Sequence, residues 1–168
     1  MNIFLVGPMG AGKSTIGLLL SKELNSPFYD IDKVIEERAG ANIPWIFDIE
    51  GEEGFRLREE QVIEEVTLYS PAIVATGGGA VLSAQNRSKL SSRGMVIYLK
   101  TTVEQQLERT SKDKNRPLLQ AVSPKKILTE LMLKREPLYN QVCDLTINTD
   151  KRHPKAVVAE IVKRIKEI

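Results

Sequence analysis

The residues GPMGAGKS, at positions 7–14, carry the clearest chemical signal in this sequence. They fit the pattern G-x-x-x-x-G-K-[ST] in full, in which glycines let backbone N–H groups wrap a phosphate. The motif follows an apolar run and opens a helical pattern, so a helix N-terminus would add positive potential. We expect Lys13 to reach the β- and γ-phosphates of a nucleoside triphosphate and Ser14 to ligate Mg²⁺. A glycine-rich turn with an incidental lysine is the weaker interpretation.

Two aspartates follow the second apolar run. Asp30 and Asp32 end an expected strand, and ligands bind at such strand ends in parallel sheets. Generic P-loop proteins hold Mg²⁺ with an acidic residue after a third apolar strand, but here that position is Thr76. Asp30 can fill this role, and Asp32 can then orient an attacking hydroxyl and accept its proton. Alternatively, Asp32 caps the helix that we expect to start at Lys33.

Arg56 and Glu59 are three residues apart and would share a helix face. The commoner outcome of this spacing is a surface ion pair. The functional alternative is an arginine that binds a substrate carboxylate and is held in place by Glu59. Phe47 and Phe55 could wall an apolar ring face, although a place in the core is the better expectation for each of them taken singly.

Three consecutive glycines, Gly77, Gly78 and Gly79, follow the third apolar run. They could form only a flexible turn. Their position at the carboxyl end of a strand, beside the phosphate motif, instead predicts a close-approach surface. Backbone N–H groups would there meet a substrate and its incoming phosphate.

Two arginines in the second half of the chain are further candidates. Arg116 lies in SKDKNRPLLQ, at positions 111–120, which we interpret as the loop most able to move. An arginine brought down by such a loop can neutralise charge on a transferring phosphoryl group. Arg135 stands late in an expected helix, where it could simply complement the helix dipole.

The elements that must position these residues alternate between strand and helix patterns. Strands are expected at 3–6, 27–29, 73–75, 96–99 and 145–147. Helices are expected at 14–24, 33–39, 45–49, 53–69, 84–91, 103–110, 124–139 and 154–166. This order predicts an α/β fold in which helices cover both faces of a parallel sheet.

Composition limits the classes of function. The chain of 168 residues suits one domain, and 42% apolar with 27% charged residues indicates a soluble globular protein. A net charge of +2 gives no reason to expect a nucleic-acid or membrane partner.

The N-terminus does not resemble a signal peptide. Cys143 is the only cysteine and His153 the only histidine, which excludes an intrachain disulfide and paired Cys or His metal sites; we expect a cytoplasmic protein.

Taken together, these motifs resemble the shikimate kinase family, within the P-loop nucleoside monophosphate kinase-like fold. The likeness covers essentially the whole chain, and the combination is far more specific than the phosphate motif alone. It comprises GPMGAGKSTIG, YDID, IFDIEGEEGFRLREE, TGGGAV, NRPLL, KREPLY and TDKRHP. The resemblance implies ATP-dependent phosphorylation of the 3-hydroxyl of shikimate, in the route to chorismate and the aromatic amino acids. It also implies a three-layer αβα sandwich with a five-stranded parallel sheet in the order 2-3-1-4-5.

The resemblance further implies roles for individual residues. Asp32 would be the base, with Lys13 and Arg116 as the other catalytic residues. Shikimate would be bound by Asp32, Phe47, Phe55, Arg56, Glu59, Gly77, Gly78, Gly79 and Arg135. ATP would be bound by Gly10, Ala11, Gly12, Lys13, Ser14, Thr15, Arg109, Arg116 and Arg152, and Mg²⁺ by Ser14 and Asp30.

The organisation implied by the resemblance is one kinase domain over residues 1–168. A substrate-binding region would span about 31–60 and a lid about 111–122, and the enzyme would work as a monomer. Two alternatives remain open. One is another small-molecule kinase of this fold, acting on gluconate or a nucleoside monophosphate. The other is a nucleotide-dependent switch that hydrolyses ATP slowly and binds a protein partner.

Overall fold

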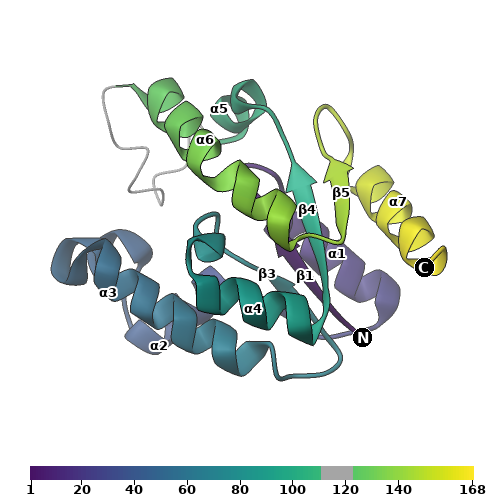
Figure 1. The fold of residues 1–168 in the computed structure, drawn as a ribbon, viewed down its shortest axis with the longest axis horizontal. Coiled ribbons are helices and arrows are strands. Elements are labelled where there is room, and N and C mark those ends of the chain that lie inside the picture. Colours follow the sequence, from purple (N-terminus) through teal and green to yellow (C-terminus); the bar gives the residue numbers. More distant parts are fainter. Residues whose placement is uncertain (111–122) are drawn as a thin grey trace.

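The computed structural model describes residues 1–110 and 123–168. Within these residues, five parallel strands form one sheet in the order β2-β3-β1-β4-β5. Figure 1 labels β3, β1, β4 and β5 of this sheet. The strands are β1 Asn2–Val6, β2 Phe28–Asp30, β3 Ala72–Ala75, β4 Met95–Lys100 and β5 Leu145–Asn148. The expected α/β class and strand order are therefore confirmed.

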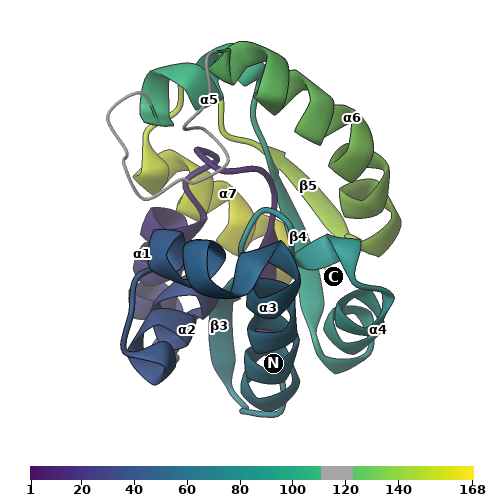
Figure 2. The ribbon, with the colours of Figure 1, turned by 90° about the vertical axis from the view of Figure 1, so that its left-hand side faces the viewer.

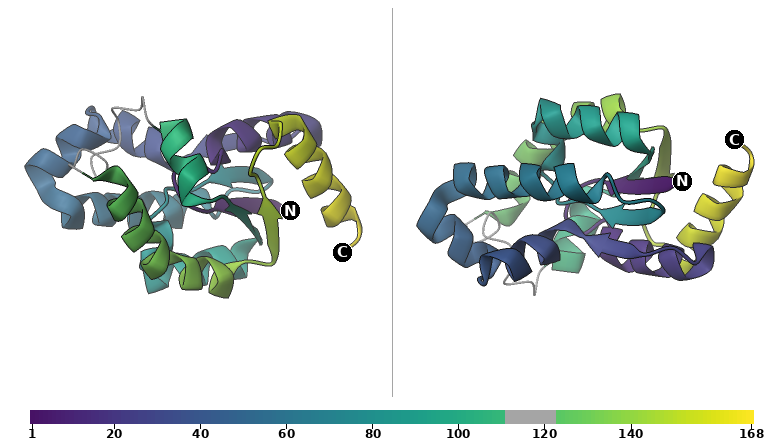
Figure 3. Two further views of the ribbon diagram at one scale, coloured as in Figure 1. Left: turned by 90° about the horizontal axis from the view of Figure 1, so that it is seen from above. Right: turned by 90° about the horizontal axis from the view of Figure 1, so that it is seen from below.

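Helices cover both faces of this sheet (Figure 3). The helices are α1 Lys13–Leu24, α2 Ile31–Ala39, α3 Ile43–Val66, α4 Ala84–Arg93, α5 Val103–Thr110, α6 Pro124–Val142 and α7 Pro154–Lys166, and a 3₁₀ turn, η1, spans Ala80–Leu82. In Figure 2, α1 lies on the left of the strands and α4 and α6 lie on the right. The three layers match the expected sandwich.

The central strand explains why the sheet needs cover on both faces. All five residues of β1 are buried, and alternate side chains enter different cores because successive side chains point to opposite faces. Ile3 and Leu5 join the cluster beneath α1 and α7. Phe4 and Val6 join the cluster beneath α3, α4 and α6. A strand buried on both faces is typical of a parallel sheet.

Two helix boundaries differ from the sequence expectation. The helix expected to start at Lys33 begins at Ile31, and Asp30 caps it by accepting from the Lys33 backbone N–H at 3.4 Å. The cap interpretation of Asp32 is therefore wrong, because this residue lies inside the first turn. The segments expected at 45–49 and 53–69 form the single helix α3, which is kinked at Gly51 (φ 72°, ψ 179°).

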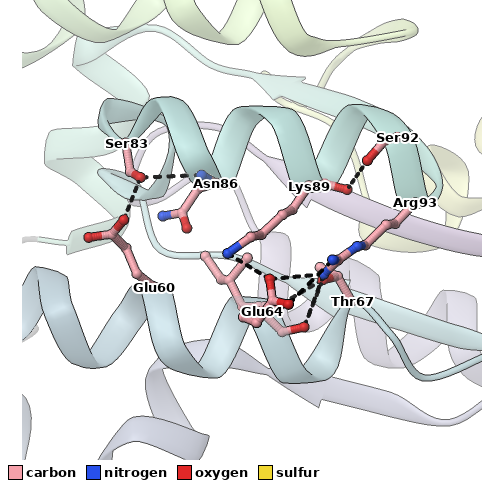
Figure 4. Close-up of polar contacts among 9 residues, drawn as sticks. Glu60, Glu64, Thr67, Ser83, Asn86, Lys89, Ser92 and Arg93 are labelled. Atoms are coloured by element: carbon pink, nitrogen blue, oxygen red, sulfur yellow. Dashed lines mark hydrogen bonds and ion pairs between the residues drawn. The ribbon is translucent and has the colours of Figure 1, made fainter.

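Polar contacts fix α4 against α3 (Figure 4). Glu64 of α3 accepts from Lys89 at 2.6 Å and from Arg93 at 3.2 Å. Ser83, which caps α4, donates to Glu60 at 3.0 Å. Since α4 follows the glycine turn closely, these contacts hold that turn in place relative to the second half of α3.

Two further features concern membrane spans and the expected lid. Within residues 1–110 and 123–168, no helix combines the length and apolar character that a membrane crossing requires. The lid expected at about 111–122, with Arg116, lies outside the described residues.

Candidate active site

The phosphate motif forms a loop between β1 and α1. Its glycines adopt left-handed backbone conformations, with φ of 147° at Gly7, 81° at Gly10 and 90° at Gly12, which favour glycine. The Lys13 ammonium group donates to the carbonyl oxygens of Gly7 at 2.6 Å and Pro8 at 2.9 Å, so the loop curls around it. The first turn of α1 leaves backbone N–H groups without helical partners, and such an end binds phosphate.

A cavity of about 280 Å³ joins this loop to the ends of β2 and β3. It brings together most of the predicted phosphate, metal and base residues. Its lining consists of Gly10, Gly12, Lys13, Ser14, Thr15, Asp30, Asp32, Thr76, Gly77, Gly78, Arg109 and Thr110. The cavity thus connects a phosphate cradle with a carboxylate and a glycine turn, which is the layout that phosphoryl transfer requires.

Ser14 and Asp30 lie together on one side of this cavity. The Ser14 hydroxyl donates to Asp30 Oδ2 at 2.5 Å, so both oxygens could contact one ion. Among the described residues, no group of three or more His, Cys, Asp or Glu side chains could hold a metal ion. Two hard oxygen donors suit Mg²⁺, because this ion usually binds few protein ligands and completes its octahedron with phosphate and water.

Gly77 lies between two carboxylates. A Cβ atom on Gly77 would stand 3.0 Å from Asp32 Oδ1 and 3.1 Å from Glu59 Oε2, closer than ordinary contact. Asp32 lines the cavity, whereas the Glu59 side chain is only 1% exposed. The missing side chain at Gly77 therefore lets two acidic groups converge on the turn.

Glu59 and Arg56 form a partly buried pair. Arg56 Nη1 donates to Glu59 Oε1 at 2.9 Å, and the side-chain exposures are 19% for Arg56 and 1% for Glu59. Burial raises the pKa of Glu59 to about 7, against the opposing effect of the neighbouring Arg56. The interpretation of this spacing as a surface ion pair is therefore wrong.

Gly79 makes room for Arg56. Its backbone conformation, φ −98° and ψ 5°, is open to other residues, so glycine is not needed here for its dihedral angles. A Cβ atom on Gly79 would overlap the Arg56 guanidinium group, at 2.7 Å from Cζ. The group that approaches Gly79 in this structure is a side chain of the protein itself; the expected approach of a substrate to the backbone N–H groups stays a prediction.

Arg135 stands on the other side of the same turn. Its side chain is buried, and its Nη1 atom would lie 3.3 Å from a Cβ atom on Gly78. Burial lowers the pKa of Arg135, and nearby Arg56 lowers it further, while the Tyr139 hydroxyl opposes both effects. Because α6 continues to Val142, a role in complementing the helix dipole is not supported. Two neighbouring guanidinium groups suit an anion that accepts hydrogen bonds from both.

The two phenylalanines belong partly to the core. Phe55 is 4% exposed and lies in the cluster beneath α3, while Phe47 packs against that cluster. Their ring centroids are 5.0 Å apart, and the Arg56 guanidinium lies 5.2 Å from the Phe55 ring centroid. The core expectation is confirmed for Phe55, and its ring also supports the arginine from below.

Arg109 and Arg152, which we expected near adenine, both bond to residues 148–149. Arg109 donates to the Thr149 carbonyl at 2.8 Å and to the Gly10 carbonyl at 2.8 Å, so it braces the phosphate loop. Arg152 donates to the Asn148 carbonyl at 2.9 Å and pairs with Glu160 at 2.6 Å. Arg109 lines the cavity, whereas Arg152 does not.

Tyr139 belongs to the site, although no expectation from the sequence assigned it a role. Its hydroxyl donates to the Gly78 carbonyl at 2.5 Å, and its side chain is fully buried. The signal was present in the sequence, because Tyr139 follows Arg135 by four residues and therefore shares its helix face. The spacing alone did not indicate a role for Tyr139, because the sequence does not show that this helix contacts the glycine turn.

Comparisons with known proteins agree with this geometry. The family model for shikimate kinase matches residues 9–166. A shikimate kinase of Vibrio vulnificus is 56% identical over 99% of this chain and 96% of the relative. A shikimate kinase of Haemophilus influenzae is 58% identical over 98% of this chain and 92% of the relative.

Solved structures give the same assignment. The shikimate kinase of Acinetobacter baumannii in complex with shikimate superposes with a TM-score of 0.97 at 49% identity, covering 99% of this chain and 93% of that one. A gluconokinase of Sinorhizobium meliloti reaches a TM-score of 0.60 at 14% identity over 98% of this chain and 95% of that one, which shows a shared fold alone. The chain therefore belongs to the shikimate kinase family.

Proposed function

We propose that this chain transfers the γ-phosphoryl group of ATP to the 3-hydroxyl of shikimate, giving shikimate 3-phosphate and ADP. One observation carries the proposal: a single turn, Gly77 to Gly79, meets the base candidate on one side and two arginines on the other. Gly77 and Gly78 of this turn line the cavity that opens onto the phosphate loop. A hydroxy acid held there would present a hydroxyl to the phosphate site while its carboxylate stays on the arginines.

Asp32 is the group that we assign to the reacting hydroxyl. It lines the cavity together with Lys13, which supports a role for this carboxylate as the proton acceptor. In phosphoryl transfer such a carboxylate mainly orients the nucleophile and takes its proton. The chain needs no covalent phospho-enzyme, because direct in-line transfer joins the two substrates across one cavity.

Arg56 and Arg135 form the clamp that we assign to the shikimate carboxylate. Arg56 is held by Glu59 at 2.9 Å and supported by the Phe55 ring, and Arg135 is fixed by burial. Guanidinium groups bind carboxylates through paired N–H donors, which gives orientation as well as affinity. Phe47 completes the apolar side of this region by packing on Phe55.

ATP would occupy the phosphate loop, with Lys13 on its β- and γ-phosphates and the backbone of residues 10–15 around them. Mg²⁺ on Ser14 and Asp30 would supply charge neutralisation for the transferring group. Arg109 and Arg152 are proposed as adenine neighbours and Arg116 as a further cation at the phosphates. We also propose the substrate region at 31–60 and the lid at 111–122.

The deciding experiment is a coupled ADP-release assay with shikimate, gluconate and nucleoside monophosphates as acceptors. We expect ADP release to depend on shikimate and on Mg²⁺. Preferential use of gluconate or a nucleotide would replace shikimate with another acceptor of this fold. ATP turnover that no small acceptor changes would instead indicate a nucleotide-dependent switch.

The Asp32→Asn variant tests the base. We expect kcat to fall by roughly 10²- to 10⁴-fold, because amide nitrogen and oxygen cannot take the hydroxyl proton. ATP binding should persist, as measured by calorimetry, because the phosphate loop is unchanged. Turnover near that of the unaltered enzyme would remove Asp32 from this role.

We further propose that the enzyme is a cytoplasmic monomer. Cys143 is a free thiol in the structure, in keeping with a reducing compartment. All assigned residues come from one chain, so no second copy is required to complete the site. Light scattering during gel filtration should give the mass of one chain, and a stable larger mass would contradict the monomer.

A further inference from the structure

We infer that Tyr139 is a positioning residue for the shikimate clamp: its hydroxyl holds the glycine turn at the spacing that lets Arg56 and Arg135 meet one ligand. The inference rests on the proposed function, because it assigns the anion between the two arginines to shikimate. Tyr139 itself touches no reacting atom, so its effect must pass through the turn and the arginines.

A hydrogen bond joins α6 to the turn. The Tyr139 hydroxyl donates to the Gly78 carbonyl oxygen at 2.5 Å, while the side chain is 0% exposed. A buried phenol needs a partner, and besides the Gly78 carbonyl this hydroxyl also interacts with the Arg135 guanidinium group. The orientation of the ring and the position of the Gly78 peptide are therefore fixed together.

The same helix face carries one of the two clamp arginines. Arg135 precedes Tyr139 by one helical turn, and its Nη1 atom lies where a Cβ atom on Gly78 would be 3.3 Å away. Two side chains of α6 therefore meet Gly78: Tyr139 bonds to its carbonyl, and Arg135 approaches its Cα. The Tyr139 hydroxyl thus links the turn to Arg135, because it bonds to the Gly78 carbonyl and interacts with the guanidinium group.

The position of Arg56, the second arginine of the clamp, also depends on the position of the turn. Gly79 follows Gly78 directly, and its Cα stands so close to Arg56 that a Cβ atom would overlap the guanidinium group. A shift of the Gly78 peptide would therefore move the surface against which Arg56 rests. One buried hydroxyl thus sets the relative positions of both guanidinium groups that we assign to the carboxylate.

Tyr98 of β4 provides a matched control. Its side chain is also 0% exposed, and its ring packs on Tyr139 with centroids 5.0 Å apart. Its hydroxyl donates to Glu136 Oε2 at 2.6 Å, so it bonds to the same helix α6 but not to the glycine turn. Removing the Tyr98 hydroxyl therefore removes a partly buried hydrogen bond to α6 without releasing Gly78.

The test compares Tyr139→Phe with Tyr98→Phe in the full-length enzyme. For Tyr139→Phe we expect the shikimate KM and the calorimetric shikimate Kd to rise about five- to tenfold. The KM for ATP and kcat should stay within about twofold of the values for the unaltered enzyme. The lost interaction binds shikimate equally in the ground state and the transition state, so it affects KM and not kcat. Tyr98→Phe should lower thermal stability but leave the shikimate KM within about twofold of the unaltered enzyme.

Three outcomes are decisive. A shikimate affinity unchanged in Tyr139→Phe overturns the inference, as does an equal loss in both variants, which would reflect general destabilisation. Absence of shikimate turnover in the unaltered enzyme would instead refute the proposed function.

If Tyr139→Phe does not fold, 3-fluorotyrosine labelling of the unaltered chain provides the second measurement. The four tyrosines give four ¹⁹F resonances, which Tyr→Phe variants of the others assign. The Tyr139 resonance should shift on addition of shikimate, while that of exposed Tyr69 should not. A Tyr139 resonance whose chemical shift does not change on addition of shikimate contradicts the inference.

Discussion

Each glycine of the turn makes room for charged side chains that we assign to the site, and at Gly79 the fit is tightest. The Gly79→Ala variant places a Cβ atom inside the Arg56 guanidinium group, so the arginine must leave its place in the clamp. We expect the shikimate Kd to rise by about tenfold or more, a loss of roughly 1.4 kcal/mol, while the ATP Kd changes little. Calorimetry with each ligand measures both; intact shikimate affinity in a folded variant would restore the view of a simple turn.

Glu59 should make stability depend on pH. Its pKa is about 7 in the folded chain against an ordinary 4.5, so the folded state binds the proton more tightly than the unfolded state. The protonated Glu59 therefore makes its full contribution to the free energy of unfolding below pH 4.5, and this contribution is lost as the pH rises toward 7. The rise of this pKa from 4.5 to about 7 corresponds to a loss of unfolding free energy on the order of 3 kcal/mol.

The Glu59→Gln variant isolates this effect, because glutamine does not titrate. As the pH rises from 4.5 to 7, the unfolding free energy of the unaltered chain should fall relative to that of the variant. Denaturant titrations at each pH measure both free energies. Parallel curves for the two proteins would show that Glu59 ionises at an ordinary pKa in the fold.

At the scale of elements, the kink in α3 sets the angle between the half that carries Phe47 and the half that carries Arg56. Gly51 has φ 72° and ψ 179°, a region that is essentially restricted to glycine. No atom lies within 4 Å of a Cβ atom at this position. Any cost of Gly51→Ala must therefore come from the backbone and not from crowding.

Gly51→Ala should destabilise the fold by about 1–3 kcal/mol and raise the shikimate KM, because relief of the strain changes the kink. Gly40→Ala is the matched control, since Gly40 also has positive φ (67°) and open space around it but ends α2 instead. It should cost about 1 kcal/mol with an unchanged shikimate KM. Equal effects of the two variants on KM would mean that the kink does not shape the substrate site.

The order of elements could be predicted from the sequence because it depends on local patterns. Gly40 ends α2 in a left-handed conformation, and Asn42 caps α3 by accepting from the Trp45 backbone N–H at 2.9 Å, as their residue types predict. Helix α6 passes through Pro137, as the helix expected at 124–139 does. The carbonyl that loses its partner belongs to Leu133, which is 75% exposed, so water can replace the missing bond.

The burial of charged residues could not be predicted in the same way. Arg135 stands between Lys134 and Glu136 in a segment that looks solvent-exposed, and Arg56 with Glu59 has the spacing of a surface pair. Their environments depend on contacts with the glycine turn, which is distant in the sequence from all of them. Residue types and spacing therefore indicated the candidates, while only the packing of α3 and α6 against the turn distinguished a clamp from surface charges.

At the scale of the whole molecule, the parallel sheet gathers the site at one edge. The phosphate loop follows β1, Asp30 and Asp32 lie at the end of β2, and the glycine turn follows β3. Because β1 lies beside β3, and β3 beside β2, these three strand ends meet where ligands bind in such sheets. The strand order thus makes one cavity from segments that are distant in the chain.

This arrangement predicts that the two substrates stabilise the fold through separate residues. A ligand at 100 times its Kd should raise the free energy of unfolding by about 2.7 kcal/mol, for shikimate and for ATP with Mg²⁺ alike. Arg56→Ala should remove the effect of shikimate at that concentration but keep the effect of ATP, and Lys13→Ala should show the reverse pattern. Thermal unfolding of both variants with each ligand measures this; loss of both effects in either variant would mean that the clamp and the phosphate loop act as one unit.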